Sequence, residues 1–249
     1  MSFRAARRAV TLGCALALCI MRYWAIRVRG RLSLERRALW LQDACRLVLG
    51  SLGVRYTVEG EPPGRGIVVS NHLSYLDVAI LSAAMPCFFV AKAEIRGWPF
   101  FGKAARTGGT LFIDRSSLAS AEKVAALISS RLDLAVPVLF FPEGTSTDGS
   151  SVLRFHARLF EPAVKSGAPV TAAALRYIQA DGAPERDLCW YGDEGFLSHL
   201  WKVLGTAGFT AEIRFGEPRV YRHRRVAAEA TRSEIVIMRN ARRLVSPSA

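Results

Sequence analysis

Apolar and polar positions along the chain change from a helical spacing to short strand-like runs near residue 54. Between residues 34 and 52, apolar side chains recur three or four positions apart, and Gly50 and Gly53 stand at the end of this stretch. This spacing predicts an amphipathic helix. After Gly53, the predicted strands are Val54–Glu59, Ile67–Ser70, Phe88–Val90, Thr110–Ile113, Val136–Phe141, Val170–Tyr177 and Ala211–Phe215. The predicted helices between and after them are Tyr75–Ala84, Leu118–Leu132, Leu159–Lys165 and Val226–Leu244.

The alternation of strands and helices predicts an α/β fold with a mostly parallel sheet flanked by helices. Parallel strands need crossover connections, and these cover both faces of the sheet. The pattern divides the chain into residues 1–53, interpreted as N-terminal membrane-associating helices, and residues 54–249, interpreted as one globular domain. Polar motifs that directly follow a predicted strand are candidates for an active site, because ligands of such folds bind at the carboxyl ends of the strands.

An apolar stretch near the N-terminus lies between two groups of arginines. Residues 9–21 carry no charge, with Arg4, Arg7 and Arg8 before them and Arg22 after them. A helix over these residues reaches only about 20 Å, against about 30 Å for the hydrocarbon core of a bilayer. Extension of the helix to Ile26, with Arg22 reaching the interface, makes a tilted single pass marginally possible.

The first 53 residues are therefore expected to contact a membrane, although the apolar helix is barely long enough to cross it. A cleaved signal peptide is disfavoured, because no A-x-A-like site follows Met21. The helix over residues 34–52 has an alternative, which is to pack on an ordinary core. Its apolar neighbour and the arginines favour an in-plane, monotopic membrane element. The five cysteines form no C-x-x-C pair, so we expect membrane association at the cytoplasmic face, where thiols stay reduced.

Composition and charge narrow the classes of partner. The chain is 51% apolar, which excludes a disordered protein, and its 34 basic and 21 acidic residues give a net charge of +13 that is concentrated at both ends. Nucleic acid, a membrane surface and an acidic substrate all fit this sign. The basic run 221–225 has no companion recognition fold, which favours a solvated or lipid-headgroup-facing cluster over a nucleic-acid patch. The four histidines are scattered, so we expect no metal site.

Chemically active residues follow the predicted strand Ile67–Ser70. This strand runs directly into Asn71 and His72, and Ser74 and Asp77 follow before the next helix. If Ser74 is the N-cap, Ser74-x-x-Asp77 is a capping box, and the Asp77 carboxylate folds back toward His72. A histidine oriented by a carboxylate at a strand end is a candidate general base. The alternative is that Ser74 and Asp77 only cap the helix.

Two other strand ends carry similar polar chemistry. Phe141-Pro142-Glu143-Gly144-Thr145 closes one strand with a carboxylate and a glycine, and Asp114-Arg115 closes another. Because parallel strands end at the same edge of a sheet, these motifs and His72 are expected to share one crevice.

The motifs together resemble one family. Asn71, His72 and Asp77 form an N-H-x-x-x-x-D box, and three further blocks follow in the family's order: residues 92–115, residues 141–145 and residues 168–170. The chain looks like the glycerolipid acyltransferases that resemble 1-acyl-glycerol-3-phosphate acyltransferase. The resemblance covers about residues 55–177, and it makes residues 54–249 an acyltransferase domain.

The resemblance implies transfer of a fatty acyl group from acyl-CoA or acyl carrier protein to the hydroxyl of a lysolipid. It assigns His72 as general base and Asp77 as its orienting partner. The residues that it places at the acceptor-binding region are Asn71, Ser74, Arg115, Glu143, Gly144 and Thr145. Attack of a hydroxyl on a thioester with a near-neutral base needs neither a metal nor a further cofactor. The expected partners are membrane lipids and the acyl donor, and no nucleic acid.

One position departs from the family pattern. Relatives that use lysophosphatidic acid usually carry Arg after F-P-E-G-T, whereas this chain has Ser146. Residues 145–149 and 191–201 look more like the branch that includes lyso-ornithine lipid acyltransferases. The commonest chemistry of the family still puts 1-acyl-glycerol-3-phosphate first as acceptor, with Arg115, Arg154 or Arg158 as phosphate ligands. Lyso-ornithine lipid or another lysolipid is the alternative, and a noncatalytic lipid- or nucleic-acid-binding module is an alternative of another class.

Overall fold

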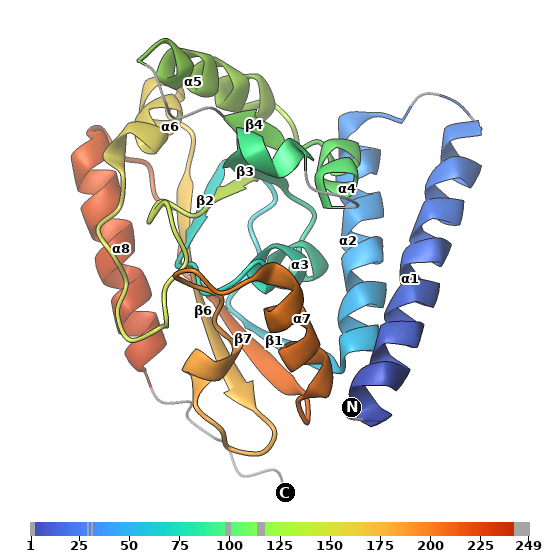
Figure 1. Cartoon of the computed structure of the whole chain (residues 1–249). Coiled ribbons are helices and arrows are strands. Elements are labelled where there is room, and N and C mark those ends of the chain that lie inside the picture. The colour runs from blue at the N-terminus through green and yellow to red at the C-terminus, as the bar shows by residue number, and fades with distance from the viewer. Residues whose placement is uncertain (1–2, 29, 31, 98–100, 114–117, 242–249) are drawn as a thin grey trace, which may run out of the picture.

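The computed structural model describes residues 3–28, 30, 32–97, 101–113 and 118–241, which form a seven-stranded sheet with helices on both faces (Figure 1). The strands are β1 (Val54–Glu59), β2 (Ile67–Ser70), β3 (Phe88–Lys92), β4 (Leu111–Ile113), β5 (Val138–Phe140), β6 (Val170–Gln179) and β7 (Phe209–Phe215). The α-helices are α1 (Phe3–Val28), α2 (Leu34–Leu52), α3 (Leu76–Ala84), α4 (Phe101–Gly108), α5 (Leu118–Leu132), α6 (Glu161–Ser166), α7 (Phe196–Gly205) and α8 (Arg224–Asn240). Three short 3-10 helices are η1 (Ala93–Gly97), η2 (Ala157–Phe160) and η3 (Glu185–Leu188).

The predicted α/β fold with a mostly parallel sheet is confirmed. The strand order is β1-β7-β6-β2-β5-β3-β4, and all neighbouring pairs are parallel except β6 with β7. β2 is short and central, with β5 on one side and β6 on the other. Its last residue, Ser70, pairs with Ala173, so β6 continues for six residues beyond the end of β2. The chain that leaves β2 therefore runs beside the second half of β6.

Helices bury the two faces of the sheet in separate cores. One core joins α1, α2, α3 and α7 to one face, with Leu49, Ile80, Val203 and Leu175 among its members. The other joins α5, α6 and α8 to the opposite face, with Phe140 in its interior. Figure 1 shows α8 on one side of the sheet and the α1–α2 pair on the other. The two cores are separate because consecutive strand residues point to opposite faces of the sheet.

The N-terminal helices α1 and α2 lie side by side as a hairpin (Figure 1). The indole nitrogen of Trp40 donates to the carbonyl of Cys19 across the two helices, at 3.3 Å. α2 ends at Gly53, whose φ of 71° suits glycine, and a Cβ there would meet the Arg8 guanidinium at 2.2 Å. Arg8 also donates to the carbonyls of Leu204 and Thr206 at the end of α7. The start of α1 is thus tied to the globular part of the chain.

The apolar stripe predicted on residues 34–52 faces the protein core, which is the core-packing alternative for that helix. Leu41, Cys45, Leu49 and Leu52 of α2 are buried, and α2 packs on α3. Exposed apolar surface lies instead along α1, on Val10, Leu16, Ile20, Met21, Trp24 and Val28. Among the described residues, α1 alone has the length and composition to cross a membrane, and 6% of its apolar window is buried.

Several element ends differ from the predicted ones. α1 has 26 residues and includes Arg7, Arg8 and Arg22, so the flanking charges do not end the helix. This makes α1 about 39 Å long, rather than the 20 Å expected from the uncharged stretch alone. α4 and α7 were not predicted. α8 begins two residues before the predicted helix, and the predicted end at Leu244 lies outside the described residues.

Candidate active site

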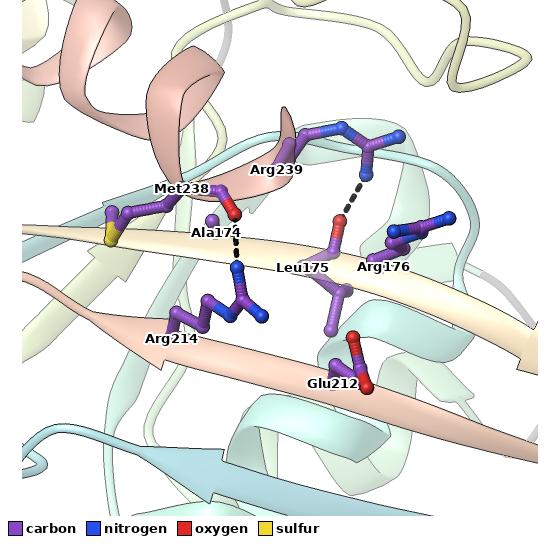
Figure 2. A pocket seen from close by; sticks show the side chains of 7 residues that line it. All are labelled: Ala174, Leu175, Arg176, Glu212, Arg214, Met238 and Arg239. Carbon is purple, nitrogen blue, oxygen red and sulfur yellow. Dashed lines mark hydrogen bonds between the residues drawn. The ribbon is translucent and has the colours of Figure 1, made fainter. Parts of the chain in front are cut away.

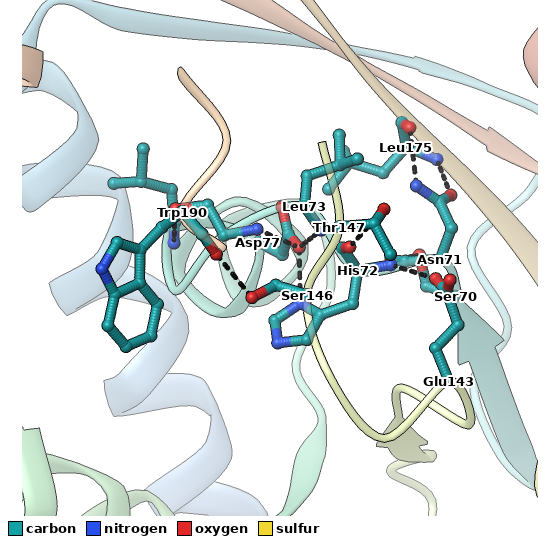
Figure 3. A network of polar contacts seen from close by, with 12 residues as sticks. Ser70, Asn71, His72, Leu73, Asp77, Glu143, Ser146, Thr147, Leu175 and Trp190 are labelled. Carbon is teal, nitrogen blue, oxygen red and sulfur yellow. Dashed lines mark hydrogen bonds and ion pairs between the residues drawn. The ribbon is translucent and has the colours of Figure 1, made fainter. Parts of the chain in front are cut away.

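The loop from Asn71 to Asp77 begins where β2 ends, and Asn71 fixes it to the neighbouring strand. The Asn71 side chain accepts from the backbone N–H of Leu175 at 2.8 Å and donates to the carbonyl of Leu175 at 3.0 Å (Figure 3). Asn71 is 2% exposed. Its amide thus replaces the backbone pairing that β2 no longer supplies to β6, and it holds the next residue, His72, at the edge of the sheet.

His72 and Asp77 meet as the capping pattern predicted. Nδ1 of His72 lies 2.7 Å from Oδ2 of Asp77, and the same oxygen accepts from the N–H groups of Leu73 (2.7 Å) and Ser74 (3.0 Å). The carboxylate is fully buried, whereas 21% of the His72 side chain is exposed. A carboxylate beside Nδ1 favours the tautomer with the proton on Nδ1. Nε2 then keeps the lone pair that a general base needs.

The helix cap and the His72–Asp77 pair are not alternatives, because one carboxylate serves both. α3 begins at Leu76, whose N–H donates to the Ser74 hydroxyl at 3.3 Å. The N–H of Asp77 bonds the Ser74 carbonyl at 3.1 Å. The Asp77 side chain returns to the Ser74 N–H as in a capping box, although the N-cap of α3 is Tyr75 rather than the predicted Ser74.

The loop that follows β5 holds the backbone of His72 from the other side. Oε1 of Glu143 accepts from the N–H of His72 at 2.7 Å, and Oε2 accepts from the N–H of Leu153 at 2.7 Å. The N–H of Thr147 donates to the His72 carbonyl at 2.9 Å. Both backbone groups of His72 are therefore bonded to this loop. Burial raises the pKa of Glu143, and the two N–H donors oppose that effect.

The remaining predicted acceptor-binding residues fall in different surroundings. Gly144 turns the loop with φ 82°, and Thr145 is exposed. Ser74 is fully buried in the start of α3. Arg115 lies outside the described residues, so its expected place beside His72 stays a prediction. Phe141 stacks on the His72 imidazole with ring centroids 4.0 Å apart.

Two residues that the sequence analysis missed also contact the loop. The hydroxyl of Tyr177, on β6, donates to Oδ1 of Asp77. The N–H of Trp190 donates to the carbonyl of Leu73 at 2.9 Å, and the Ser146 hydroxyl donates to the carbonyl of Trp190 (Figure 3). Tyr177 had one sequence signal, a phenol on the buried side of a strand, which requires a polar partner. Trp190 had none, because its loop has no periodic pattern.

On the other face of the sheet, a small pocket lies where β6, β7 and α8 meet. Figure 2 shows Arg239 of α8 reaching the carbonyl of Leu175, and Arg214 of β7 reaching that of Met238. The Leu175 carbonyl thus accepts from both Arg239 of α8 and Asn71, the residue that follows β2. α8 thereby fixes the part of β6 that positions the His72 loop.

Comparisons with known proteins give a family and several similar enzymes. The acyltransferase family model matches residues 54–176. A lyso-ornithine lipid O-acyltransferase of Rhodobacter capsulatus is 39% identical over 70% of this chain and 65% of its own length. Another, from Pseudomonas aeruginosa, is 36% identical over 72% of this chain and 67% of its own length. A 1-acyl-sn-glycerol-3-phosphate acyltransferase of Neisseria gonorrhoeae is 36% identical over 62% of this chain and 60% of its own length.

A solved structure has the same fold. The crystal structure of the 1-acyl-sn-glycerophosphate acyltransferase PlsC from Thermotoga maritima aligns with a TM-score of 0.67, covering 96% of each chain at 17% identity. The curated relatives are longer than the match, which spans about two thirds of the lyso-ornithine lipid enzymes. From the motifs around His72 and these relatives together, the chain belongs to the acyltransferase family.

Proposed function

We propose that this protein transfers a fatty acyl group from a thioester donor to the hydroxyl of a membrane lysolipid. The observation that carries the proposal is the His72–Asp77 pair at 2.7 Å, with the carboxylate buried and the imidazole partly exposed. Nδ1 is held by Asp77, so Nε2 is the ring atom left to accept a proton. A neutral imidazole in this position removes the proton of an alcohol as the alcohol attacks a carbonyl.

The proposed reaction has two steps that balance on His72. Nε2 takes the proton of the lysolipid hydroxyl while its oxygen forms a bond to the thioester carbonyl carbon. The tetrahedral intermediate then breaks its C–S bond, and the imidazolium gives the proton to the leaving thiolate. Asp77 stabilises the imidazolium between the two steps, as a buried carboxylate does in related base–acid pairs. The donor is an acyl-CoA or an acyl carrier protein. We propose neither a metal nor a nucleic acid as a partner in these steps.

For the acceptor, we propose lyso-ornithine lipid ahead of 1-acyl-glycerol-3-phosphate. The sequence alone ranks the phosphate lipid first, and two features of the chain support the reverse ranking. Ser146 stands where phosphate-using relatives carry Arg, and its hydroxyl is engaged by the Trp190 carbonyl. Residues 181–195, which include Trp190, hold five carboxylates and one arginine. This charge suits a headgroup with an ammonium better than a phosphate. The lyso-ornithine names of two relatives point the same way.

1-Acyl-glycerol-3-phosphate is the second candidate, because an exposed cation adjoins the loop that follows β5. Arg154 is exposed and directly follows Leu153, whose N–H is bonded by Glu143. A side chain here has the charge that a phosphate needs. The 36% identity to a phosphate-lipid enzyme of Neisseria gonorrhoeae adds to this candidate.

The acceptor is tested by kinetics on both lysolipids with the wild type and Ser146→Arg. We expect the wild type to have the higher kcat/KM on lyso-ornithine lipid. We expect Ser146→Arg to gain activity on 1-acyl-glycerol-3-phosphate, by about 10-fold or more, because an Arg–phosphate pair is a charge-assisted contact. Ser146→Thr is the matched control, since it keeps the hydroxyl. A wild-type preference for the phosphate lipid that Ser146→Arg leaves unchanged would assign phosphate binding to Arg154 or another cation.

A lysolipid acceptor resides in a bilayer, so we also propose that the protein works on a membrane surface, at the cytoplasmic face. The exposed apolar residues of α1 support this placement. α1 is packed along α2, and Arg8 ties its start to α7. A helix held in this way against the domain suits in-plane contact better than a span.

A further inference from the structure

Tyr177 lies inside the protein at the point where β6 passes the His72 loop. It is 2% exposed and alternates along β6 with the exposed residues Arg176 and Ile178. Its hydroxyl donates to Oδ1 of Asp77. The other oxygen, Oδ2, receives Nδ1 of His72 and the N–H groups of Leu73 and Ser74. The two oxygens of one buried carboxylate thus have separate partners.

Independent contacts hold Tyr177 in this position. Its backbone N–H donates to Oε1 of Glu185 at 2.7 Å. Oε2 of Glu185 pairs with Arg239 of α8 at 2.8 Å. The Tyr177 ring packs on Phe209 of β7, with centroids 5.0 Å apart. The phenol is therefore aimed at Asp77 by β6, β7 and α8 rather than by the loop that it supports.

From this geometry we infer that Tyr177 is a positioning residue for acyl transfer, the third member of a Tyr177–Asp77–His72 relay of hydrogen bonds. The inference rests on the proposed function, because it assigns His72 the role of base. Tyr177 does not touch the substrate. It acts through Asp77, whose carboxylate it fixes in the plane that directs Oδ2 at Nδ1 of His72.

A second effect of the Tyr177 hydroxyl is electrostatic. Oδ1 of Asp77 is buried, and a buried carboxylate oxygen without a donor binds a proton more readily. If the phenol is removed, the negative charge of the Asp77 carboxylate has one donor fewer and attracts the His72 imidazolium more strongly. We therefore expect the imidazolium to form at higher pH. The titratable groups around the carboxylate are His72 of the same loop, Tyr177 of β6, Glu143 of the loop after β5 and Cys189 beyond η3. Burial raises the pKa of both Glu143 and Cys189, which favours their neutral forms.

The test is Tyr177→Phe in the full-length membrane-bound protein, which removes one oxygen and keeps the ring. Tyr56→Phe is the matched control, because the Tyr56 hydroxyl also donates in the same core, to the Ala83 carbonyl at 3.1 Å, and does not touch Asp77. We expect Tyr177→Phe to lower kcat by about 10-fold or more, the size for a bond to a charged group. KM is expected to change little, and the acidic limb of the kcat/KM profile is expected to move to higher pH.

A double-mutant cycle separates a relay from a general loss of packing. In an Asp77→Asn background, adding Tyr177→Phe is expected to change kcat by less than about 2-fold, because the partner on which it acts is already altered. A full additional loss in that background would overturn the inference. So would a Tyr177→Phe enzyme with wild-type kcat, or one whose loss leaves the pH profile unmoved and matches the loss in Tyr56→Phe.

Two further measurements keep the test decisive. If Tyr177→Phe does not fold, 3-fluorotyrosine at position 177 keeps the packing and donates more strongly, so the acidic limb must move to lower pH, and an unmoved limb overturns the inference. The imidazole titration of His72, followed by NMR with labelled histidine, reads the relay without turnover. An inactive wild type rejects the proposed function, whereas an unchanged His72 titration in Tyr177→Phe rejects the relay.

Discussion

At the scale of single residues, the His72 imidazole is restrained on two sides. Its ring is stacked on Phe141 at an interplanar angle of 11°, and its Nδ1 is bonded to Asp77. Its backbone N–H and carbonyl are bonded to Glu143 and Thr147. A base held in this way loses little entropy in reaching the reactive geometry. The direction of Nε2 is therefore a property of the fold before any substrate binds.

The role of His72 is tested by His72→Ala. We expect turnover to fall by at least about 100-fold, the lower range for a positioned base, because the nitrogen that accepts the proton is removed. The melting temperature is expected to stay close to that of the wild type, since the ring is partly exposed and contributes little to the core. His156→Ala is the control, because His156 is an exposed loop histidine. Near-normal activity of His72→Ala would contradict the proposed mechanism.

A substitution at Glu143 distinguishes two roles for this residue, binding of the acceptor and positioning of the base His72. Both of its oxygens accept backbone N–H groups, and Gln offers one oxygen only. We expect Glu143→Gln to lower kcat by about 10-fold, because one N–H of the pair, His72 or Leu153, loses its acceptor. Steady-state kinetics with varied lysolipid measures this. A rise in KM at constant kcat would instead assign Glu143 to the acceptor, as the family resemblance implies.

At the scale of elements, the predicted and observed structures agree where the signal is local. β1, β2 and α5 have the predicted bounds, because glycines and a change of periodicity mark their ends. The antiparallel pairing of β6 with β7 was not predicted, because periodicity carries no strand direction. The contact between His72 and Asp77 could be predicted from the sequence, because only five positions separate the two residues. Tyr177 is 100 positions from Asp77, so only the folded sheet brings the two together.

α7 was missed because its N-cap, Gly195, ends a segment that reads as a loop, although Leu200, Val203 and Leu204 have helical spacing. Its His199 is fully buried, and Nδ1 of His199 lies 3.1 Å from the Tyr75 hydroxyl. Burial lowers the pKa of His199, with Lys202 acting in the same direction and Glu194 against it. Burial thus favours the neutral form of this imidazole, and α7 also packs on α1.

The pH dependence of stability follows from that buried imidazole. Because the pKa of His199 is lower in the folded than in the unfolded chain, its contribution is complete above the ordinary value of about 6.5 and is lost as pH falls below it. We expect His199→Phe to melt at lower temperature at pH 7.5, because the Tyr75 contact is lost. Its further decrease between pH 7.5 and 5.5 should be smaller than that of the wild type. His223→Gln, at an exposed histidine, should leave the decrease unchanged; an equal decrease in His199→Phe would exclude this origin.

At the scale of the whole molecule, the positive charge of the two ends is partly internal. Several arginines donate to backbone carbonyls or pair with carboxylates within the chain: Arg8, Arg37, Arg214, Arg224, Arg232 and Arg239. These side chains hold α1 to the end of α7, α2 to α4, and α8 to β6 and β7. The net charge of +13 therefore overstates what is free to attract an anionic surface, and apolar contact through α1 gains weight as the means of attachment.

Membrane attachment is expected to resist salt for that reason. The Debye length falls to about 3 Å at 1 M salt, which screens exposed charges and leaves apolar contact intact. We expect the full-length protein to sediment with membranes at 1 M salt. Deleting residues 1–30 should weaken attachment, but it also removes Arg8 and its bonds to α7. A triple variant with Ser at Val10, Met21 and Trp24 changes only exposed positions of α1.

That triple variant is compared with one of matched size elsewhere. Val220, Val226 and Ile237 are also exposed apolar residues, at the C-terminal part of the chain. Replacing them with Ser removes a comparable apolar surface away from α1. Sedimentation after a 1 M salt wash measures both, with the melting temperature as a check on folding. If α1 is the anchor, the α1 variant appears in the supernatant and the C-terminal variant stays in the pellet. Only the α1 variant loses the apolar surface that contacts the lipid. Release of the wild type by salt alone would make the attachment electrostatic, and release of the second variant alone would move the anchor to the region of α8.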